Sequence, residues 1–385
     1  MRILIIYHAG AALSARRIYQ ALAETCEMEL TVGVPEKVSV DRVYDPSGWL
    51  CVKREEEEHG YRLVPVPLQN PSNYWQGFES KHLAHLIKKT QPEIIHVLNE
   101  PLSPGLFQVV WQKLKLSKGS KVLFYGFDNL PIRFFLGRVS YMKWKFVWAQ
   151  TAGGVTANTE ALENLKRAGF PGKRPLERIF WGVPTDIFKP MDKSLLRKSI
   201  GLDCEFIVGF VGRLVPEKGL FVLLAAMLRL PTAVHCMIIG SGPMRAELEL
   251  MCRLPELNGR IHLYDAVEAE TLAKYINCTD ALAIPSLTMP SWKEQYGRVI
   301  GEAMACGVPV VGSDSGAIPE VIGSAGLIVP EGNTVALGEA IKRAIFDQEV
   351  RAHFIQQGLE RAQQELSVKA MTRQLVGFYN RILCA

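Results

Sequence analysis

The stretch that decides the fold class is Ile207-Val208-Gly209-Phe210-Val211, followed by the turn Gly212-Arg213-Leu214-Val215-Pro216-Glu217-Lys218-Gly219. Its first five residues form a short, nearly continuous apolar run, which is typical of a strand buried on both faces of a parallel sheet. Eight further runs of this kind, separated by helical patterns, occur at positions 3–6, 94–98, 122–125, 154–157, 234–239, 261–263, 281–284 and 308–311. Together they predict an α/β fold whose parallel sheets are covered by helices on both faces.

The runs fall into two series along the 385 residues. Between the series, residues 181–190 contain two prolines and a glycine, which is typical of a linker between domains. We therefore expect two domains, 1–187 and 188–364, with the boundary near residue 188. After residue 350 the pattern is helical, and apolar residues recur at helical spacing at Met371, Leu375, Phe378 and Ile382.

The composition is that of a soluble globular protein, with 48% hydrophobic and 22% charged residues, which excludes a disordered or fibrous chain. The eight cysteines lie far apart without a Cys-x-x-Cys pair, which argues against a disulfide framework or a zinc knuckle. No apolar run approaches the roughly 18 residues of a membrane-spanning helix, and none forms a signal peptide. We therefore expect a cytoplasmic protein.

The net charge of +5 is concentrated in the first half of the chain. Residues 1–187 contain 24 Lys and Arg against 18 Asp and Glu, whereas the remainder contains 20 against 21. This modest basicity suits an anionic small molecule or an acidic lipid. It lacks the dense Lys and Arg stripes of nucleic-acid binders, so no nucleic-acid partner is expected.

One segment of the first half, positions 130–159, has no acidic residue. Cations and aromatic residues alternate there, which fits a helix lying on an anionic membrane or, alternatively, a core helix whose lysines extend to solvent. The first alternative predicts peripheral contact at the inner face of the cell membrane. The residues concerned are Arg133, Phe134, Phe135, Arg138, Tyr141, Lys143, Trp144, Lys145, Phe146 and Trp148.

Two glutamates, Glu294 and Glu302, stand eight positions apart in a segment rich in glycine and proline. On one helix they would be separated by about 12 Å of rise and ~80° of rotation, too far for the carboxyl pair of a glycosidase. We expect Glu294 in a loop and Glu302 in the helix that begins near Gly297, so that they hold opposite ends of one ligand. The free backbone N–H groups at that helix start would suit a phosphate. The alternative is a surface helix with solvated glutamates.

Arg213 and Lys218 follow a predicted strand directly and stand five residues apart. A guanidinium fork and an ammonium point charge at the carboxyl end of a strand suit a diphosphate. The alternative is a pair of exposed loop cations, one of them paired with Glu217. No two aspartates stand two apart, so we expect these cations and helix amides, without a metal ion, to neutralise the diphosphate.

Gly240 and Gly242 follow another predicted strand, and Asp265 comes 25 residues after the first of them. A dinucleotide-binding loop would have this arrangement, but the third glycine of its pattern is replaced by Arg245. A nicotinamide cofactor is therefore disfavoured, and the same loop can border a nucleotide instead.

Several of these segments together resemble family 4 of the retaining glycosyltransferases, which have the GT-B fold. They are Glu294-x7-Glu302 with the following Ala-Met-Ala-Cys-Gly-Val-Pro-Val-Val, the segment 212–219, Thr156-Ala157-Asn158-Thr159-Glu160, and the linker 182–190. The similarity spans about residues 90–335. It implies two Rossmann-like domains with parallel sheets facing across a cleft: the first binds the acceptor, the second binds the nucleotide-sugar, and a C-terminal helix of about 365–385 joins the first.

The resemblance also implies roles for single residues on the donor side. Glu302 would bind the ribose hydroxyls, Glu294 would bind hydroxyls of the transferred sugar, and Arg213 with Lys218 would hold the diphosphate. Further donor contacts are implied at Gly10, Gly212, Gly240, Gly242, Val267 near the base, and the amides of Tyr296 and Gly297. The family often has a second glycine where this chain has Ala11.

On the acceptor side, the similarity places a sugar-facing residue just before Glu100-Pro101. Here that position is Asn99, and the nearest histidine is His96, so either residue is a candidate. A histidine that ends a buried strand is otherwise a core residue. Asp128 and Asn129 follow another strand and are expected to face the acceptor.

The activity implied is the retaining transfer of a hexosyl-type sugar from a nucleotide diphosphate sugar, UDP slightly favoured over GDP, to a hydroxyl group. The acceptor would be a glycan, a lipid-linked molecule or a small molecule. No metal ion or cofactor is expected. Retention without an obvious carboxylate nucleophile is consistent with front-face attack, in which the departing phosphate takes the acceptor's proton. The alternatives are an epimerase or phosphorylase of similar shape and an inactive binding module.

Overall fold

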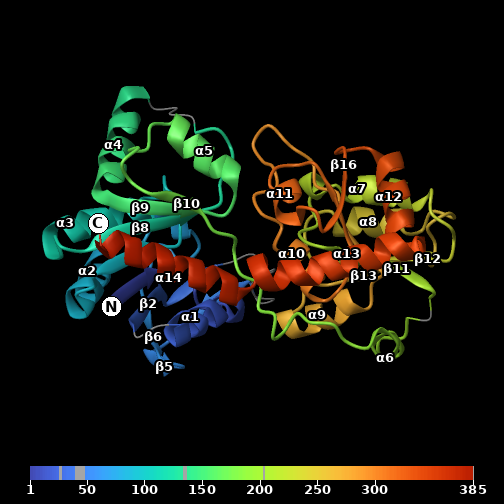
Figure 1. Cartoon of the computed structure of the whole chain (residues 1–385), viewed down its shortest axis with the longest axis horizontal. Helices are drawn as coiled ribbons and strands as arrows, with labels where there is room; N and C mark the ends of the chain where they lie inside the picture. The colour runs from blue at the N-terminus through green and yellow to red at the C-terminus, as the bar shows by residue number, and fades with distance from the viewer. Residues whose placement is uncertain (26–27, 40–47, 133–136, 203, 385) are drawn as a thin grey trace. The chain divides into compact units, whose positions relative to one another are not determined.

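The computed structural model describes residues 1–25, 28–39, 48–132, 137–202 and 204–384 (Figure 1). The chain divides into two compact units, the first comprising Met1–Gly182 with Val368–Ala385 and the second Val183–Ser367. The chain therefore leaves the first unit at residue 182 and returns to it at residue 368. The sequence pattern placed these transitions near residues 188 and 365.

The first unit contains an eight-stranded sheet of order β10-β9-β8-β7-β1-β2-β6-β5. Its pairings are parallel except between β5 and β6. A separate antiparallel pair joins β3 and β4. The strands are β1 (Arg2–Ile6), β2 (Glu29–Pro35), β3 (Lys37–Ser39), β4 (Trp49–Cys51), β5 (Glu56–Glu58), β6 (Tyr61–Val66), β7 (Ile94–Val97), β8 (Lys121–Gly126), β9 (Thr151–Thr156) and β10 (Leu176–Arg178).

Two helices that connect these strands, α3 and α5, begin at side-chain caps. The hydroxyl of Ser103 accepts a hydrogen bond from the N–H of Leu106 at the start of α3, and Asn158 caps α5 in the same way. The elements are α1 (Leu13–Thr25), η1 (Tyr74–Gln76), α2 (Ser80–Thr90), α3 (Pro104–Leu116), α4 (Gly137–Gln150), α5 (Thr159–Arg167) and α14 (Val368–Cys384).

The C-terminal helix α14 is an integral part of the first unit and packs against α1 (Figure 1). Its buried stripe contains the four residues that the helical spacing singled out, Met371, Leu375, Phe378 and Ile382. Such a stripe on one face of a helix indicates burial against a core, as observed.

The second unit contains a six-stranded sheet of order β13-β12-β11-β14-β15-β16, and all of its pairings are parallel. The strands are β11 (Phe206–Val211), β12 (Val234–Ile239), β13 (Ile261–Tyr264), β14 (Ala281–Ile284), β15 (Val310–Ser313) and β16 (Gly326–Val329). The helices are α6 (Lys193–Ser199), η2 (Pro216–Lys218), α7 (Leu220–Met227), α8 (Arg245–Met251), α9 (Ala269–Asn277), α10 (Arg298–Ala305), α11 (Ile318–Ile322), α12 (Thr334–Phe346), α13 (Gln348–Arg361) and the π-helix η3 (Ala362–Leu366).

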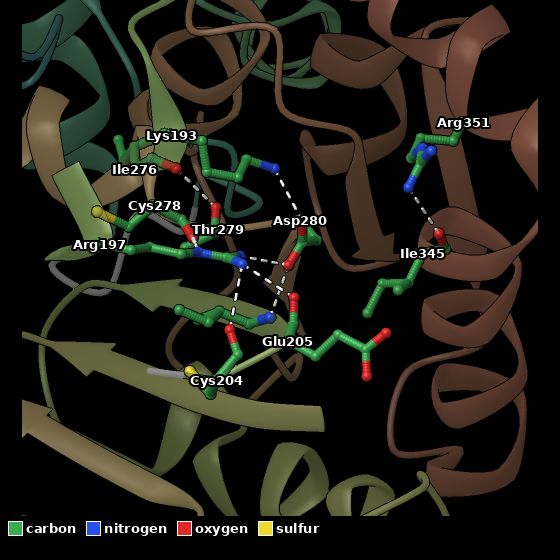
Figure 2. A network of polar contacts seen from close by, with 11 residues as sticks. Lys193, Arg197, Cys204, Glu205, Ile276, Cys278, Thr279, Asp280, Ile345 and Arg351 are labelled. Carbon is green, nitrogen blue, oxygen red and sulfur yellow. Dashed lines mark hydrogen bonds and ion pairs between the residues drawn. The ribbon is translucent and has the colours of Figure 1, made fainter. Parts of the chain in front are cut away.

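A buried carboxylate fastens α6 to the start of this sheet. Figure 2 shows Lys193 and Arg197 pointing toward Asp280, whose oxygens lie 2.8 Å from Lys193 Nζ and 2.5 Å from Arg197 Nη2. The backbone N–H of Ile207, the second residue of β11, donates to the same carboxylate at 2.7 Å. Asp280 is only 8% exposed, so these bonds offset the desolvation of its charge.

Among the residues that the structure describes, none of the helices combines the length and apolar character of a membrane span.

Candidate active site

Three loops after neighbouring strands of the second unit lie in direct backbone contact. Leu214, after β11, donates its N–H to the carbonyl of Ser241, after β12, at 2.8 Å. A Cβ on Gly240 would lie 1.9 Å from the carbonyl oxygen of Gly212, so the approach of these two loops requires glycine. The N–H of Leu287, after β14, donates to the carbonyl of Glu217 at 2.8 Å. The carboxyl edge of the sheet therefore forms one continuous loop surface, where ligands of open α/β sheets bind.

The structure brings together two residues predicted to contact different parts of one ligand. Lys218 Nζ lies 2.6 Å from Glu294 Oε2, and the hydroxyl of Ser286 donates to the same oxygen at 3.0 Å. Glu294 is 6% exposed, and the ammonium of Lys218 also lies 4.9 Å from the centre of the Trp292 ring. The carboxylate and the ammonium thus hold each other in a fixed, largely buried position.

The loop after β15 fixes the backbone of Glu294. The N–H of Ala317 donates to the carbonyl of Glu294 at 2.9 Å, and a Cβ on Gly316 would lie 2.1 Å from that oxygen. Gly316 also has a φ of +54°, a left-handed conformation that favours glycine. The position of the carboxylate therefore depends on a glycine 22 residues further along the chain.

The helix α10 begins where the sequence predicted. Gly297 is its N-cap with a φ of +75°, Glu294 precedes it in a loop, and Glu302 lies in its second turn. Burial raises the pKa of the Glu302 carboxyl, and the charge of Arg298 opposes this shift. Tyr296 is 4% exposed, so its ring is part of the packed support of this loop.

Arg213 is the more open of the two predicted diphosphate-binding cations. Its Nη2 lies 3.6 Å from Glu217 Oε1, and 38% of its side chain is exposed. The pairing with Glu217 is the contact that the alternative interpretation predicted for one of the cations. A Cβ on Gly219, where φ is +69°, would lie 1.8 Å from the carbonyl oxygen of Pro285, so glycine allows the turn after Lys218 to approach β14.

Val267 and Asp265 are the two other residues of this unit that the sequence analysis considered for nucleotide binding. Val267 is partly buried in the loop after β13 and packs against the small cluster around Met237. Asp265, which would bind a ribose in a dinucleotide-binding protein, is 88% exposed and lies 3.2 Å from Arg245 Nη1. Asp265 therefore forms an exposed ion pair with Arg245, the residue that stands in place of the third glycine of the dinucleotide-binding pattern.

In the first unit, His96 and Asn99 lie in different environments. His96 is fully buried, its Nδ1 lies 2.7 Å from the Tyr379 hydroxyl on α14, and burial lowers its pKa to about 3. This is the environment of a core histidine. Asn99 lies beyond the end of β7, is partly exposed, and accepts a hydrogen bond from the N–H of Glu100 at 2.9 Å. Of the two candidates, only Asn99 reaches the loop edge.

Glu100 is a polar residue that the sequence interpretation used for alignment but did not select for the site. Its carboxylate accepts hydrogen bonds from the N–H groups of Phe127 at 2.9 Å and Asp128 at 3.1 Å. Burial raises the pKa of Glu100 to about 7. An acid placed directly after a buried strand was the signal that could have identified it.

Glu100 lines a small pocket that is partly open to solvent. Asp128 lies at the same pocket and is exposed, whereas Asn129 is fully buried. Pro101, Leu102, Gly126, Ile132, Thr156, Ala161 and Leu165 complete the lining.

Gly10 is closely packed in the loop after β1. A Cβ there would lie 2.7 Å from both the Tyr19 hydroxyl and Val34 Cγ1. The neighbouring His8 stacks on Tyr74 with ring centres 4.0 Å apart, and burial lowers its pKa to about 4. The glycine therefore permits this loop to pack against the sheet.

The two parallel-sheet units define the GT-B fold, and solved structures with this fold superpose along the whole chain. Sucrose-phosphate synthase from Thermosynechococcus elongatus has a TM-score of 0.76 and 20% identity, covering 100% of this chain and 99% of its own. HepE from Anabaena, solved in complex with UDP and glucose, has a TM-score of 0.75 and 19% identity, covering 99% of this chain and 100% of its own.

Sequence comparison relates the second unit to a known family. Residues 192–361 match the model of the family described as glycosyl transferases group 1. The D-inositol 3-phosphate glycosyltransferase of Mycobacteroides abscessus is 36% identical over 169 residues, which are 42% of this chain and 37% of that protein. The chain spans less than two thirds of the length of the curated relatives that it matches.

Proposed function

We propose that the protein is a retaining glycosyltransferase that moves a hexosyl-type sugar from a nucleotide diphosphate sugar to a hydroxyl acceptor, with UDP preferred to GDP. The observation that carries this proposal is the Lys218–Glu294 pair at 2.6 Å, placed just before the N-terminus of α10. It combines a cation, a carboxylate and the amino end of a helix in one loop surface, as a sugar diphosphate requires. The structure of HepE with UDP and glucose supports the choice of UDP.

We propose a donor contact for each residue of this site. Lys218 would exchange its bond to Glu294 for diphosphate oxygens, which frees the Glu294 carboxylate to accept hydrogen bonds from sugar hydroxyls. The amides at the start of α10, from Tyr296 and Gly297 onward, and the open Arg213 would complete the diphosphate site. Glu302 would bind the ribose hydroxyls and Val267 would contact the base. Gly212, Gly240 and Gly242 would allow close approach of the nucleotide, and Gly10 of the first unit would do so for the donor phosphate.

Catalysis would come mainly from stabilising the leaving group. The bond between the anomeric carbon and the diphosphate oxygen breaks, the acceptor oxygen bonds to that carbon on the same face, and the departing phosphate takes the hydroxyl proton. Charge that develops on the diphosphate is met by Lys218, Arg213 and the α10 amides, so we propose a metal-independent reaction without a cofactor. Each charge-assisted contact of this kind contributes about 1.5–3 kcal/mol.

We assign the acceptor to the pocket beside Glu100 in the first unit. The pocket presents Glu100 and Asp128, with Asn99 at the neighbouring strand end, so it offers hydrogen-bond acceptors to a hydroxyl-rich molecule. We exclude His96 from this assignment because it is fully buried against Tyr379. Asn129, next to Asp128, is also fully buried.

We test the activity by scanning nucleotide-sugars for release of the nucleoside diphosphate, with and without candidate hydroxyl acceptors. Lys218→Ala should lower turnover by at least about 10²-fold, the size of effect seen when one donor to a developing charge is removed. The matched control is Lys342→Ala, which breaks an exposed Lys342–Glu339 pair of 2.7 Å and should leave turnover unchanged. Wild-type turnover in Lys218→Ala would contradict the proposed clamp.

The same scan separates the alternatives. An epimerase would convert the sugar without releasing the nucleoside diphosphate, a phosphorylase would require inorganic phosphate, and an inactive module would bind UDP without turnover. Each of these results would contradict the proposed transfer.

We also propose that the first unit contacts an anionic membrane surface through α3 and α4. On α4 the exposed fractions are 80% for Val139, 68% for Met142 and 46% for Phe146, a stripe at helical spacing. Only Val147 and Trp148 of this helix are buried, which disfavours the core-helix alternative. Arg133, Phe134 and Phe135 of the predicted segment lie outside the described residues.

The neighbouring α3 extends this surface. Lys143 of α4 lies 4.4 Å from the centre of the Phe107 ring, and Trp111 is 48% exposed with Lys115 4.8 Å from the centre of its ring. Neither helix contains an acidic residue. Exposed apolar rings with cations around them favour insertion at the level of anionic headgroups. We therefore propose that the protein is cytoplasmic and binds peripherally at the inner face of the cell membrane.

A further inference from the structure

We propose that Cys204, His235 and His262 form a binding site for a divalent transition-metal ion, with Zn²⁺ as the preferred ion. One ligand atom from each residue lies within 4.8 Å of the other two. The nearest pair is His235 Nδ1 and His262 Nε2, which are 3.0 Å apart. This site is independent of the proposed sugar transfer.

The parallel sheet of the second unit brings the three ligands together. His235 and His262 are each the second residue of their strand, β12 and β13, which pair directly. His262 is in register with Met237, so it shares a sheet face with His235, two residues earlier on β12. Cys204 comes from the segment that enters β11 and packs against the small cluster on that same face. Three separate segments thus converge at the β13 edge of the sheet.

To accept an ion, the two imidazole rings must separate and turn toward a common point, because they now face each other across the Nδ1–Nε2 hydrogen bond with ring centres 5.3 Å apart. Zn–N distances near 2.0 Å and Zn–S distances near 2.3 Å place tetrahedral ligand atoms roughly 3.3–3.6 Å apart. The two ring nitrogens are slightly closer than this, and the Cys204 sulfur lies within 4.8 Å of one nitrogen of each ring. Binding would replace the hydrogen bond between the two rings by two metal–nitrogen bonds and release the thiol proton, without any change of oxidation state.

The donor set selects the class of ion. Imidazole nitrogen and thiolate sulfur suit Zn²⁺ and Co²⁺, whereas Mg²⁺ and Ca²⁺ prefer oxygen ligands. Three protein ligands leave a fourth position for water. Arg260, in register with the start of β12, donates to the carbonyls of Met227 and Val234, so its guanidinium is already engaged by backbone oxygens.

The position of the cluster separates it from the proposed active site. His235 and His262 lie near the amino ends of their strands, whereas Lys218 and Glu294 lie in loops after the carboxyl ends. An ion here would tie the entry to β11 to the sheet edge. Its expected effect is to stabilise the folded second unit by mass action.

The first experiment titrates the full-length, metal-free protein with Co²⁺ and records its absorption spectrum. We expect one ion per chain, with the thiolate charge-transfer band and the intense visible bands of a tetrahedral site. Cys204→Ser should abolish the charge-transfer band, and His262→Gln should weaken Co²⁺ binding by more than about tenfold, because even outer-shell changes cost 10–100-fold.

The matched controls replace a cysteine and a histidine that lie outside the proposed metal site. Cys384→Ser removes an exposed thiol of the first unit, and His353→Gln removes an exposed imidazole on α13; both should retain the wild-type spectrum. Circular dichroism of the metal-free variants establishes folding, and His262→Gln decides the question if Cys204→Ser does not fold. A wild-type chain without stoichiometric Co²⁺ binding, or an unchanged spectrum in folded Cys204→Ser or His262→Gln, overturns the site.

Zn²⁺ competition completes the test. Zn²⁺ should displace Co²⁺ stoichiometrically and raise the midpoint of thermal unfolding of the wild-type chain, but not that of His262→Gln. An equal Zn²⁺-dependent shift in both proteins would overturn the proposal, because that stabilisation would come from other residues.

Discussion

At the scale of single residues, Gly316 determines where the Glu294 carboxylate can lie. A methyl group in its place would lie 2.1 Å from the Glu294 carbonyl oxygen and 3.0 Å from its nitrogen, atoms that cannot move without moving the whole loop. Gly316→Ala should therefore displace Glu294 and break its contact with Lys218. Turnover should fall by more than about tenfold, since a displacement of about 1 Å in a catalytic site can already slow a reaction strongly. Turnover and thermal unfolding of the purified variant measure the two effects.

Gly259→Ala is the matched control for this change. Gly259 also has a left-handed φ, +73°, but a Cβ there would meet nothing within 4 Å. Both variants should lose about 1–2 kcal/mol of stability through the backbone conformation, but only Gly316→Ala should lose turnover. Equal turnover in the two variants would show that the contact with Glu294 has no catalytic role.

The sequence predicted single residues better than their partners. Lys218 and Glu294 were selected separately, but their ion pair joins residues 76 positions apart, and only the folded chain shows which charges meet. For His96, the choice between core and site depended on Tyr379, which is 283 residues away. Glu100 was missed because its significance comes from the buried backbone N–H groups of the loop after β8.

At the scale of elements, nine strands were predicted from apolar runs, whereas β16, which is also apolar over Leu327–Val329, and the strands interrupted by proline, glycine or charge were missed. The nine runs correspond to β1, β7, β8, β9, β11, β12, β13, β14 and β15. Among the missed strands, β2 contains Gly33 and Pro35, and β6 contains Pro65. Proline and glycine weaken a strand pattern in sequence, although the neighbouring strands of the sheet still hold these segments extended. The helix α10 was located because its start is a glycine N-cap.

The proposed membrane contact of α3 and α4 is also tested at the scale of elements. The protein should float with vesicles that contain phosphatidylglycerol and phosphatidylcholine but not with phosphatidylcholine alone, because each cation near an anionic surface contributes about 1 kcal/mol. Met142→Ser combined with Phe146→Ser should reduce the bound fraction, and added salt should reduce it further. Flotation assays at two salt concentrations measure both effects.

The control pair for this surface lies in the second unit. Leu195 and Leu250 are each 64% exposed, on α6 and α8, so their replacement by serine removes equally exposed apolar side chains. This control should bind vesicles like the wild-type chain. Binding that is unaffected by the α4 changes, or that is equal on neutral vesicles, would contradict the proposed contact.

At the scale of the whole molecule, the chain crosses between its two units at residues 182 and 368. The two prolines and the glycine of residues 181–190 predict a domain boundary near residue 188, because turn-forming residues are typical of linkers. The second crossing has no such mark, since α13, the π-helix η3 and α14 follow each other with only Ser367 between the last two. The apolar stripe of α14 instead indicated that this helix packs against a core. In the structure α14 packs against α1 of the first unit.

The last prediction follows from this arrangement. If each unit unfolds as its own cooperative structure, calorimetry should show two transitions, and a core substitution should lower only one of them. Phe378, fully buried on α14, belongs to the first unit, and Leu224, fully buried on α7, belongs to the second. Replacing either by alanine should cost about 2–5 kcal/mol, or roughly 2–4 °C per kcal/mol for units of this size. By sequence order alone, Leu224 and Phe378 would both belong to the second half of the chain and would lower the same transition, whereas the structure assigns them to different units. A single transition that both variants lower equally would show that the chain unfolds as one cooperative structure.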